Sequence, residues 1–311
     1  NNGWGVKIAA MRNADELEAV DDIDIVFMDS ISLGCLNKLE PKNADTMVLM
    51  LSDRENGFKI ALNILNIGRI KLAAGVLGGA KGAIDESVRY AQEREQFGRP
   101  ISKYGAIRYK LAEQVIQSYV VESATYRAGQ NIDDAIKGLV DSGMEKEKAT
   151  LKGIELFAPE CAVLKVAGSE CLDYVVDEAV QIFGGMGYSA ESSVERAYRD
   201  SRINRIFEGT NEINRMLTVD MVLRRAMKGE LDLMGPAMKV AGDLMSIPEI
   251  LEPSDAPLGN EEHMVDGFKK AILMVAGSAV QKLMQSLAKE QEVLMNIADM
   301  AIWTNLAESV Y

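Results

Sequence analysis

The side chains most able to carry out acid–base chemistry in this sequence are carboxylates, because histidine is almost absent. His263 is the only histidine among 311 residues. This composition argues against a serine–histidine hydrolase, a histidine-rich zinc site and most proton relays. Acid–base catalysis would therefore depend on aspartate, glutamate, lysine or tyrosine.

Glu208 is the carboxylate whose surroundings best suit a general base. It follows Ile206 and Phe207 and precedes Gly209 and Thr210, at a boundary between apolar and polar residues. A base held among apolar side chains takes a weakly acidic proton more effectively than a solvated one does. The alternative is a solvated loop glutamate without a role, which these neighbours alone do not exclude.

Two further segments could bind phosphates. Arg94–Ile101 begins with an arginine whose planar fork could hold an anionic group in bidentate fashion, or which could be an ordinary surface cation of a helix. Gln181–Tyr188 contains the run Gly184-Gly185-Met186-Gly187. A dinucleotide-binding loop follows a strand and opens a helix, whereas this run ends a helix and also fits a simple C-cap.

A third segment, Tyr198–Ile213, carries Glu208 into the start of another helix. Thr210, Asn211 and Glu212 open that helix. The free amides of a helix N-terminus can bind a phosphate or a ribose. A charged Glu212 would oppose a diphosphate there and suits a ribose or a base better.

The elements that must position these residues are helices, because apolar residues recur at helical spacing almost throughout from Asn56. Gly75, Gly78, Gly79 and Gly82 fall within the first helix, where we expect them to allow close packing of a neighbouring helix. We predict helices through Ile60–Val88, Ile107–Glu122, Pro159–Val180, Ile213–Leu223, Phe268–Leu287 and Val293–Leu306, a loop at 96–105, a polar separator at 141–148 and a linker at 246–263, which holds three of the seven prolines.

The first 47 residues differ from the rest. Asp22–Phe27 alternates as a strand does, and Ala14–Val20 suits a short helix. No chemical motif is visible there. The predicted fold is therefore mainly α: a helical bundle, a smaller C-terminal helical extension, and a short mixed N-terminal segment.

Composition narrows the possible partners. The net charge of -13 argues against a nucleic acid and against an anionic membrane surface. Cys35, Cys161 and Cys171 have neither metal-ligand nor disulfide spacing, so we predict reduced thiols and no metal site. We also expect no transmembrane helix, since no run of about 18 uninterrupted apolar residues occurs, and no signal peptide.

In this order on long helices, the three segments together resemble the acyl-CoA dehydrogenase family. The likeness covers roughly Leu49 to Tyr311 and continues through the linker and the terminal helices, as in the long-chain and very-long-chain branch. It implies an unassigned segment at 1–48, the family's C-terminal helical-bundle domain at 49–228, and a C-terminal extension at 229–311. The family's N-terminal helical domain and most of its middle β-domain are not recognisable in the sequence.

The resemblance assigns roles to the candidate residues. It implies FAD as the cofactor and Glu208 as the catalytic base. Tyr104-Gly105 departs from the pattern of some relatives, which puts a cofactor contact there in doubt. The implied cofactor-binding residues are Arg94, Gln96, Phe97, Gln181, Gly184, Gly185, Thr210, Asn211 and Glu212, and the implied substrate-binding residues are Asn66, Arg69 and Gly209.

The implied reaction is the α,β-dehydrogenation of a fatty acyl-CoA to the trans-2-enoyl-CoA. Glu208 would take the α-proton, and flavin N5 would accept the β-hydride. A minority of the family places the base immediately before the arginine matched by Arg69, where this sequence has Gly68. Electron-transfer flavoprotein is the implied electron acceptor, a homodimer the implied assembly, and the bacterial cytoplasm or a compartment like the mitochondrial matrix the implied location. The alternatives are an acyl-CoA oxidase and a non-catalytic helical scaffold.

Overall fold

The computed structural model describes residues 8–11, 25–28, 47–50, 57–244 and 254–311. The chain divides into two compact units, residues 1–65 and 66–311. The predicted helix at 14–20 and Cys35 lie outside the described residues.

The first unit contains a three-stranded parallel sheet in the order β1 (Ile8–Met11), β2 (Ile25–Met28), β3 (Met47–Met50). Ile25 in the middle strand pairs with Ile8 on one side and Met47 on the other. Runs rich in Ile, Val and other apolar residues favour such strands. The predicted strand at 22–27 corresponds to β2, which begins at Ile25.

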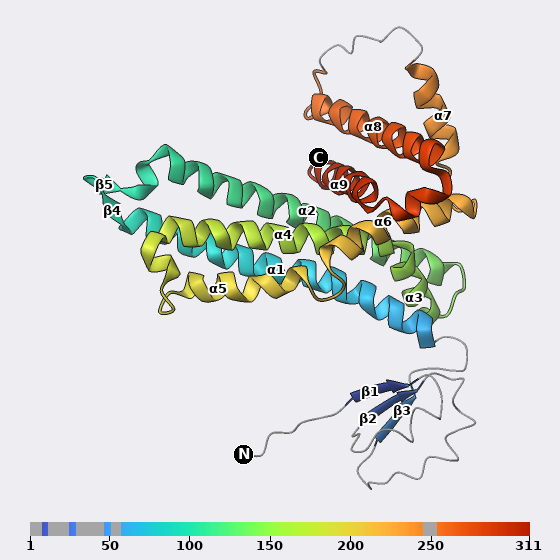
Figure 1. Ribbon diagram of the computed structural model, residues 1–311, viewed down its shortest axis with the longest axis horizontal. Coiled ribbons are helices and arrows are strands. Elements are labelled where there is room, and N and C mark those ends of the chain that lie inside the picture. The colour runs from blue at the N-terminus through green and yellow to red at the C-terminus, as the bar shows by residue number, and fades with distance from the viewer. Residues whose placement is uncertain (1–7, 12–24, 29–46, 51–56, 245–253) are drawn as a thin grey trace. The chain divides into compact units, whose positions relative to one another are not determined.

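The second unit is helical, and the prediction of a mainly α fold is confirmed (Figure 1). A hairpin of β4 (Glu95–Gln96) and β5 (Arg99–Pro100) and the 3₁₀ helices η3 (Ile101–Lys103), η4 (Gly184–Tyr188), η5 (Arg202–Arg205) and η6 (Met284–Lys289) lie between the longer helices. These are α1 (Gly57–Glu93), which begins in the first unit, α2 (Gly105–Asp141), α3 (Lys146–Leu156), α4 (Ala158–Phe183), α5 (Ser193–Ser201), α6 (Asn211–Met227), α7 (Met234–Asp243), α8 (Gly259–Leu283) and α9 (Gln291–Glu308).

Three short helices were not predicted, namely α3, α5 and α7. Helices α3 and α5 are short and rich in charged residues, so each offers few apolar residues that would mark it in the sequence. The predicted loop at 96–105 contains the β4–β5 hairpin and η3. The predicted linker at 246–263 extends too far toward the C-terminus, because α8 begins at Gly259.

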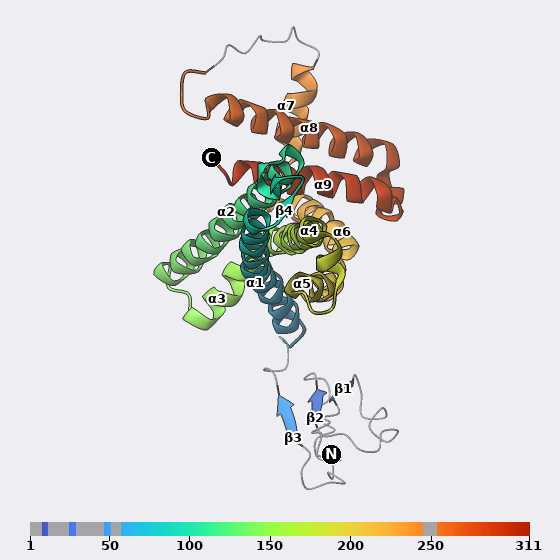
Figure 2. The ribbon, with the colours of Figure 1, turned by 90° about the vertical axis from the view of Figure 1, so that its left-hand side faces the viewer.

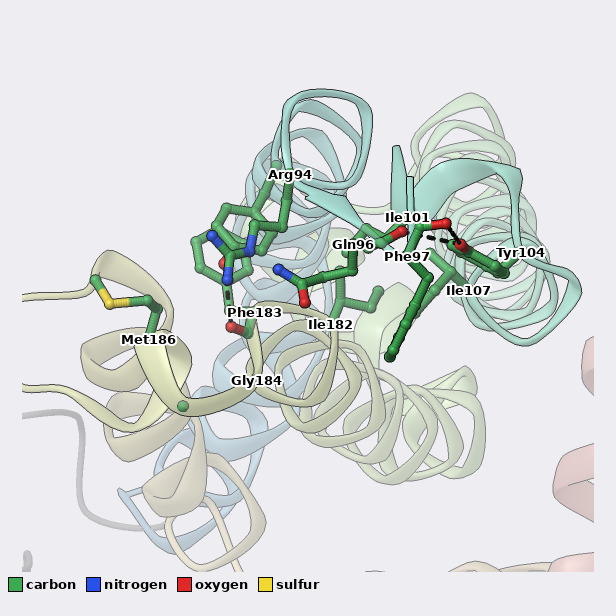
Figure 3. Close-up of a pocket in the computed structure, with 12 residues that line it drawn as sticks. Arg94, Gln96, Phe97, Ile101, Tyr104, Ile107, Ile182, Phe183, Gly184 and Met186 are labelled. Carbon is green, nitrogen blue, oxygen red and sulfur yellow. Dashed lines mark hydrogen bonds between the residues drawn. The ribbon is translucent and has the colours of Figure 1, made fainter. Parts of the chain in front are cut away.

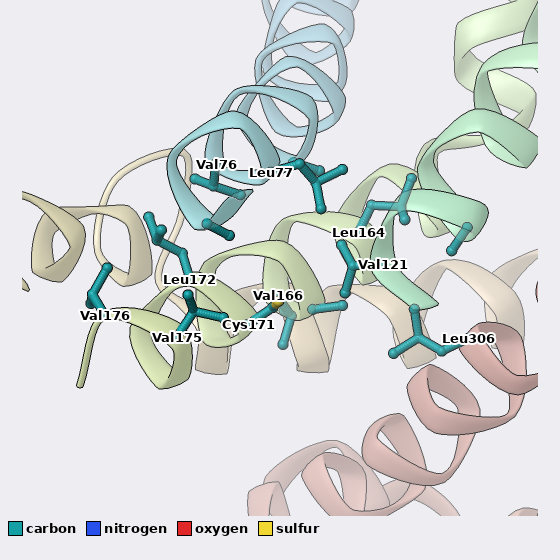
Figure 4. Close-up of a cluster of buried hydrophobic side chains, with 14 of the residues drawn as sticks. Val76, Leu77, Val121, Leu164, Val166, Cys171, Leu172, Val175, Val176 and Leu306 are labelled. Atoms are coloured by element: carbon teal, nitrogen blue, oxygen red, sulfur yellow. The ribbon is translucent and has the colours of Figure 1, made fainter. Parts of the chain in front are cut away.

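α4 is the central helix of the bundle. Its side chains are buried on several faces, as expected of a helix that is apolar most of the way round. Figure 4 shows side chains of α1, α2 and α9 converging on it, and Figures 1 and 2 show α1 and α2 running beside it. The labelled members of this core are Val76, Leu77, Val121, Leu164, Val166, Cys171, Leu172, Val175, Val176 and Leu306.

The close approach of α1 and α4 depends on Gly168 rather than on the predicted glycines of α1. A Cβ on Gly168 would lie 3.1 Å from the Cα of Ala73. In contrast, a Cβ on Gly75, Gly78 or Gly82 would meet no described atom within 4 Å. The glycines of α1 therefore differ: a Cβ on Gly79 would lie 3.5 Å from Leu172 of α4, whereas the other three predicted glycines face open space among the described residues.

The C-terminal helices α8 and α9 cross the direction of the bundle helices (Figure 2). They form a second apolar cluster with α6. α9 also contributes Ile302 and Leu306 to the main core. The extension is therefore joined to the bundle and not a separate appendage.

The stretch Gly259–Lys289 is long and apolar enough, by length and composition alone, to cross a membrane. Its most apolar window has a mean hydropathy of 1.2 and is 11% buried. The sequence-based prediction of no transmembrane helix considered only uninterrupted apolar runs. It is wrong for this stretch by the criterion of length and composition. Helices that pack on protein pass the same test, and α8 packs against α7 and α9.

Candidate active site

Glu208 lies in a sharply turned segment between η5 and α6. Its φ is 59°, and that of Gly209 is 84°. A left-handed conformation is unfavourable for a residue with a Cβ, so the surrounding structure must hold Glu208 in place. The helix that follows is capped by Thr210, whose hydroxyl oxygen accepts a bond from the Ile213 amide at 3.3 Å.

The side chain of Asn214 stabilises this turn through hydrogen bonds. Its fully buried side-chain amide donates to the backbone carbonyls of Gly209 at 2.8 Å, Thr210 at 3.1 Å and Glu208 at 3.3 Å. A flipped amide would turn Oδ1 toward three carbonyl oxygens, so the donor must face them. Sequence reasoning missed Asn214, although an amide one turn into a capped helix is the signal that could have found it.

Arg69 on α1 provides a second support. Its Nε donates to the Glu208 carbonyl at 3.2 Å, and its Nη1 donates to Oδ1 of Asn66 at 3.1 Å. Both side chains are buried, so Arg69 is not the helix-surface cation that was its alternative interpretation. Burial lowers the pKa of Arg69, but an arginine remains charged in proteins.

The Glu208 carboxylate lies against the backbone of α1 at Gly68. A Cβ added to Gly68 would lie 2.6 Å from Glu208 Oε2 and 2.9 Å from Oε1. Any larger residue would therefore meet the carboxylate. A groove beside Glu208 is lined by three glycines on one face of α1, namely Gly68, Gly75 and Gly79.

This groove has a volume of about 500 Å³. Its walls combine α1 with residues of α4 and of the turn before α6. Of these glycines, Gly75 meets no described atom within 4 Å of an added Cβ, whereas Gly79 also packs against Leu172 of α4. Besides the three glycines and Glu208, the lining residues are Lys71, Leu72, Val76, Leu172, Asn204 and Phe207.

At the start of α6, Asn211 is buried and its neighbour Glu212 is exposed. Asn211 is 2% exposed, and its side chain turns into the bundle, where Lys165 donates to its Oδ1 at 2.7 Å. Ser169 and Glu170 bond the same amide group. Glu212 is exposed. The structure therefore brings Thr210 and Asn211 into a supporting network and leaves Glu212 at the surface.

A second cavity, of about 710 Å³, lies where α1, the hairpin and the end of α4 meet (Figure 3). It brings together Arg94, Gln96, Phe97, Gly184 and Gly185, which the sequence had grouped as one binding site. The predicted Gln181 is exposed and does not line it. Tyr104, where the sequence left a cofactor contact in doubt, also lines the cavity. The lining residues that sequence reasoning missed are Tyr90, Ile101, Ile107, Ile182, Phe183 and Met186.

Aromatic rings give this cavity flat walls. Tyr90 and Phe183 stack with their ring centroids 4.0 Å apart, and the Tyr90 hydroxyl donates to the Phe183 carbonyl at 3.3 Å. Tyr104 meets Phe97 edge-on at 6.4 Å and donates to the Gln96 carbonyl at 2.9 Å. Phe97 is 92% exposed at φ 50°, which leaves its ring face available to a flat ligand.

The structure thus combines a helical bundle with two concave sites, a groove beside the Glu208 carboxylate and a cavity lined by aromatic side chains and Arg94. Two family profiles, both described as "Acyl-CoA dehydrogenase, C-terminal domain", match residues 55–223 and 267–311. The chain belongs to the acyl-CoA dehydrogenase family.

Relatives from bacteria and mammals are similar to this chain in sequence. A "Probable acyl-CoA dehydrogenase" of Bacillus subtilis is 42% identical over 274 residues, which are 84% of this chain and 46% of that protein. The human "Very long-chain specific acyl-CoA dehydrogenase, mitochondrial" is 41% identical over 192 residues, 61% of this chain and 26% of that protein.

A solved structure shares the fold. It is an acyl-CoA dehydrogenase from Bacillus anthracis complexed with FAD, 47% identical, with a TM-score of 0.77 over 82% of this chain and 43% of that one. The chain thus spans less than half the length of these relatives.

Proposed function

We propose that this chain provides the catalytic base and part of the FAD site of an acyl-CoA dehydrogenase. The observation that carries the proposal is the Glu208 carboxylate, held against Gly68 at the end of an open groove. We further propose the division into an N-terminal segment at 1–48, a bundle domain at 49–228 and an extension at 229–311.

The residues of the aromatic cavity fit the chemistry of FAD. Phe97 and Tyr104 offer flat surfaces to a ring system. Arg94, exposed at the cavity, can pair its guanidinium with a diphosphate. Cβ atoms on Gly184 and Gly185 would meet no described atom within 4 Å, so the backbone there is open to a ligand. When bound, FAD supplies the hydride acceptor.

In the proposed reaction, Glu208 accepts the α-proton of a fatty acyl thioester lying in the groove. The C–H electron pair becomes the new α,β double bond as the β-hydride leaves, giving the trans-2-enoyl-CoA. Arg69 and Asn214 hold the Glu208 carbonyl and so fix the direction of the neighbouring backbone. The Glu208 N–H can then stabilise negative charge on the thioester oxygen.

In this proposal Asn66 and Arg69 act on the substrate indirectly, by supporting Glu208. The Nε and Nη1 groups of Arg69 donate to the Glu208 carbonyl and to Asn66 inside the protein. Gly209 keeps the turn open, because a Cβ there would lie 3.2 Å from Asn214 Nδ2. Thr210 and Asn211 hold the start of α6, and Glu212 remains available at the surface.

The aromatic cavity and the Glu208 groove serve different flavins in the proposed assembly. The cavity, with Arg94, Gln96, Phe97, Gly184 and Gly185, would hold the ADP half of FAD bound mainly by a second copy of the chain, and the exposed Gln181 would reach the same FAD from outside the cavity. We therefore propose a homodimer. Electron-transfer flavoprotein would take the electrons. An acyl-CoA oxidase would pass them to oxygen instead, and assays with each acceptor separate the two.

The substitution Glu208→Gln tests the proposal in the complete, FAD-loaded protein. We expect FAD and acyl-CoA to bind as in the wild type, because the side-chain shape is kept. The rate of flavin reduction by acyl-CoA should fall by at least about a hundredfold, the contribution of a positioned general base. Near-normal flavin reduction would refute the assignment of Glu208, and a wild-type protein without bound flavin would favour the non-catalytic scaffold.

A further inference from the structure

A continuous series of side-chain bonds joins the C-terminal helix α9 to the start of α6. Arg215 Nε donates to Asp299 Oδ1 at 2.6 Å. The other two nitrogens of the same guanidinium donate to the carboxylate of Glu170, at 2.7 and 2.9 Å. Glu170 Oε1 in turn accepts from the Asn211 amide at 3.0 Å. Three helices, α9, α6 and α4, therefore meet at one arginine.

The geometry around Arg215 is that of a strong ion pair. Its side chain is 13% exposed, and those of Glu170 and Asp299 are 39% exposed. Arginine–carboxylate pairs with two parallel bonds fix direction as well as distance. Burial opposes the charge of Arg215, but its bonds to Glu170 and Asp299 prevail and raise its pKa. Arg215 is thus charged at all physiological pH values.

Arg215 is placed to act on the turn that carries Glu208. It follows directly after Asn214, whose amide holds the carbonyls of Glu208, Gly209 and Thr210. Asn211 lies one helical turn earlier, on the same side of α6 as Arg215. A shift of this first turn of α6 would therefore move the Glu208 turn with it.

Among the described residues, the other ion pairs of α9 lie away from this turn. Lys269 and Arg127 both bond Glu308 near the end of α9, and they join α9 to α8 and α2. Among the described residues, Asp299 is the carboxylate of α9 that bonds a side chain of α6. α9 therefore contacts α6 through this ion pair and through the apolar cluster that contains Val219.

We propose that the C-terminal extension sets the position of the Glu208 turn through the Asp299–Arg215–Glu170–Asn211 series. These four are positioning residues, and none of them contacts the reacting atoms. The inference rests on the proposed function for its catalytic consequence. Its structural consequence, a less ordered Glu208 turn when the series is broken, does not depend on that function.

The substitution Asp299→Asn tests the proposal in the complete protein, because it removes the charge while keeping the side-chain shape. We expect amide hydrogen exchange at residues 208–212 to become at least about tenfold faster, a local loss of order. In the FAD-loaded protein, flavin reduction at saturating acyl-CoA should slow by about tenfold, while the Kd for acyl-CoA changes by less than about twofold, as expected for a displaced catalytic group.

The matched control is Asp220→Asn, which breaks an exposed ion pair with Arg224 on the same helix α6. It should leave the exchange of residues 208–212 and the rate unchanged. Asp299→Glu, which keeps the charge, should restore both measurements toward the wild type. Unchanged exchange in Asp299→Asn, or an equal change in Asp220→Asn, would overturn the proposal. Faster exchange with an unchanged rate would retain the coupling but remove its catalytic role.

Discussion

Gly68 and Glu208 lie in direct contact although they are far apart in the sequence. A Cβ on residue 68 would lie 2.6 Å from Oε2 of Glu208. The contact has two consequences. The Glu208 carboxylate occupies a position that only a glycine at residue 68 leaves free. A glutamate at residue 68 would therefore carry its own carboxylate on α1 next to the position that the Glu208 carboxylate now occupies.

We expect Gly68→Ala to lower the rate of flavin reduction without unfolding the protein. The added methyl group would displace the end of the Glu208 side chain, and a misplacement of about 1 Å can lower a rate by about a hundredfold. The carboxylate is the flexible end of a side chain, and alanine favours a helix over glycine by about 1 kcal/mol. The free energy of unfolding, measured with denaturant, should therefore stay the same or rise.

Gly78→Ala is the matched control for that substitution. Gly78 is an exposed residue of the same helix, and a Cβ there would meet no described atom within 4 Å. It should gain similar helix stability and keep the wild-type rate. If Gly68→Ala also kept the wild-type rate, the carboxylate would not be acting from the position seen here.

Moving the base should restore part of the activity. We expect the double variant Gly68→Glu with Glu208→Gly to reduce its flavin at least about tenfold faster than Glu208→Gly alone. Position 208 has a φ of 59°, which glycine adopts without cost, so its turn should persist. Stopped-flow measurement of flavin bleaching by acyl-CoA compares the two proteins. Equal rates would show that the two positions do not reach the same substrate atom.

The two glycines at the end of α4 should respond differently to alanine. Gly184 has φ 61° and ψ -140°, a region that residues with a Cβ avoid at a cost of about 1–3 kcal/mol. Gly185 has no such constraint, and a Cβ there meets open space. We expect Gly184→Ala to weaken FAD binding and to lower the midpoint of denaturant unfolding, and Gly185→Ala to leave the midpoint unchanged. Equal midpoints for the two variants would contradict this.

Lys165 should make stability depend on pH in the alkaline range. It is fully buried, and burial lowers its pKa from 10.5 to about 8. Between these values the unfolded chain holds a proton that the folded protein has released, so the free energy of unfolding rises with pH, by at most about 1.4 kcal/mol per pH unit.

The comparison protein for this effect is Lys165→Met, which lacks the titrating group. Urea unfolding of both proteins from pH 7.5 to 10.5 cancels the contribution of the other lysines and the tyrosines. We expect the wild type to gain stability relative to the variant across this range. Parallel pH curves would mean that Lys165 titrates alike in both states.

Much of the architecture follows from local patterns. Helical spacing predicted the long helices, and Gly184 was predicted as the point where α4 ends, because helix periodicity and capping depend on residues close in sequence. The family segments also located Arg94, Gln96, Phe97, Gly184 and Gly185, which the structure gathers in one cavity. The short, charged helix α3 escaped prediction because its apolar signal is weak.

What the sequence determined by itself was the long helices and the chemical groups they carry, including a glutamate beside a glycine at Glu208. Tertiary structure decided which groups meet. It placed Glu208 against Gly68, turned Arg69 inward to hold a carbonyl, and turned Asn211 into the bundle. It also left Gly68, Gly75 and Gly79 of α1 lining a groove. The reason is physical: helix periodicity is local, whereas the partner of each helix face depends on how distant segments pack.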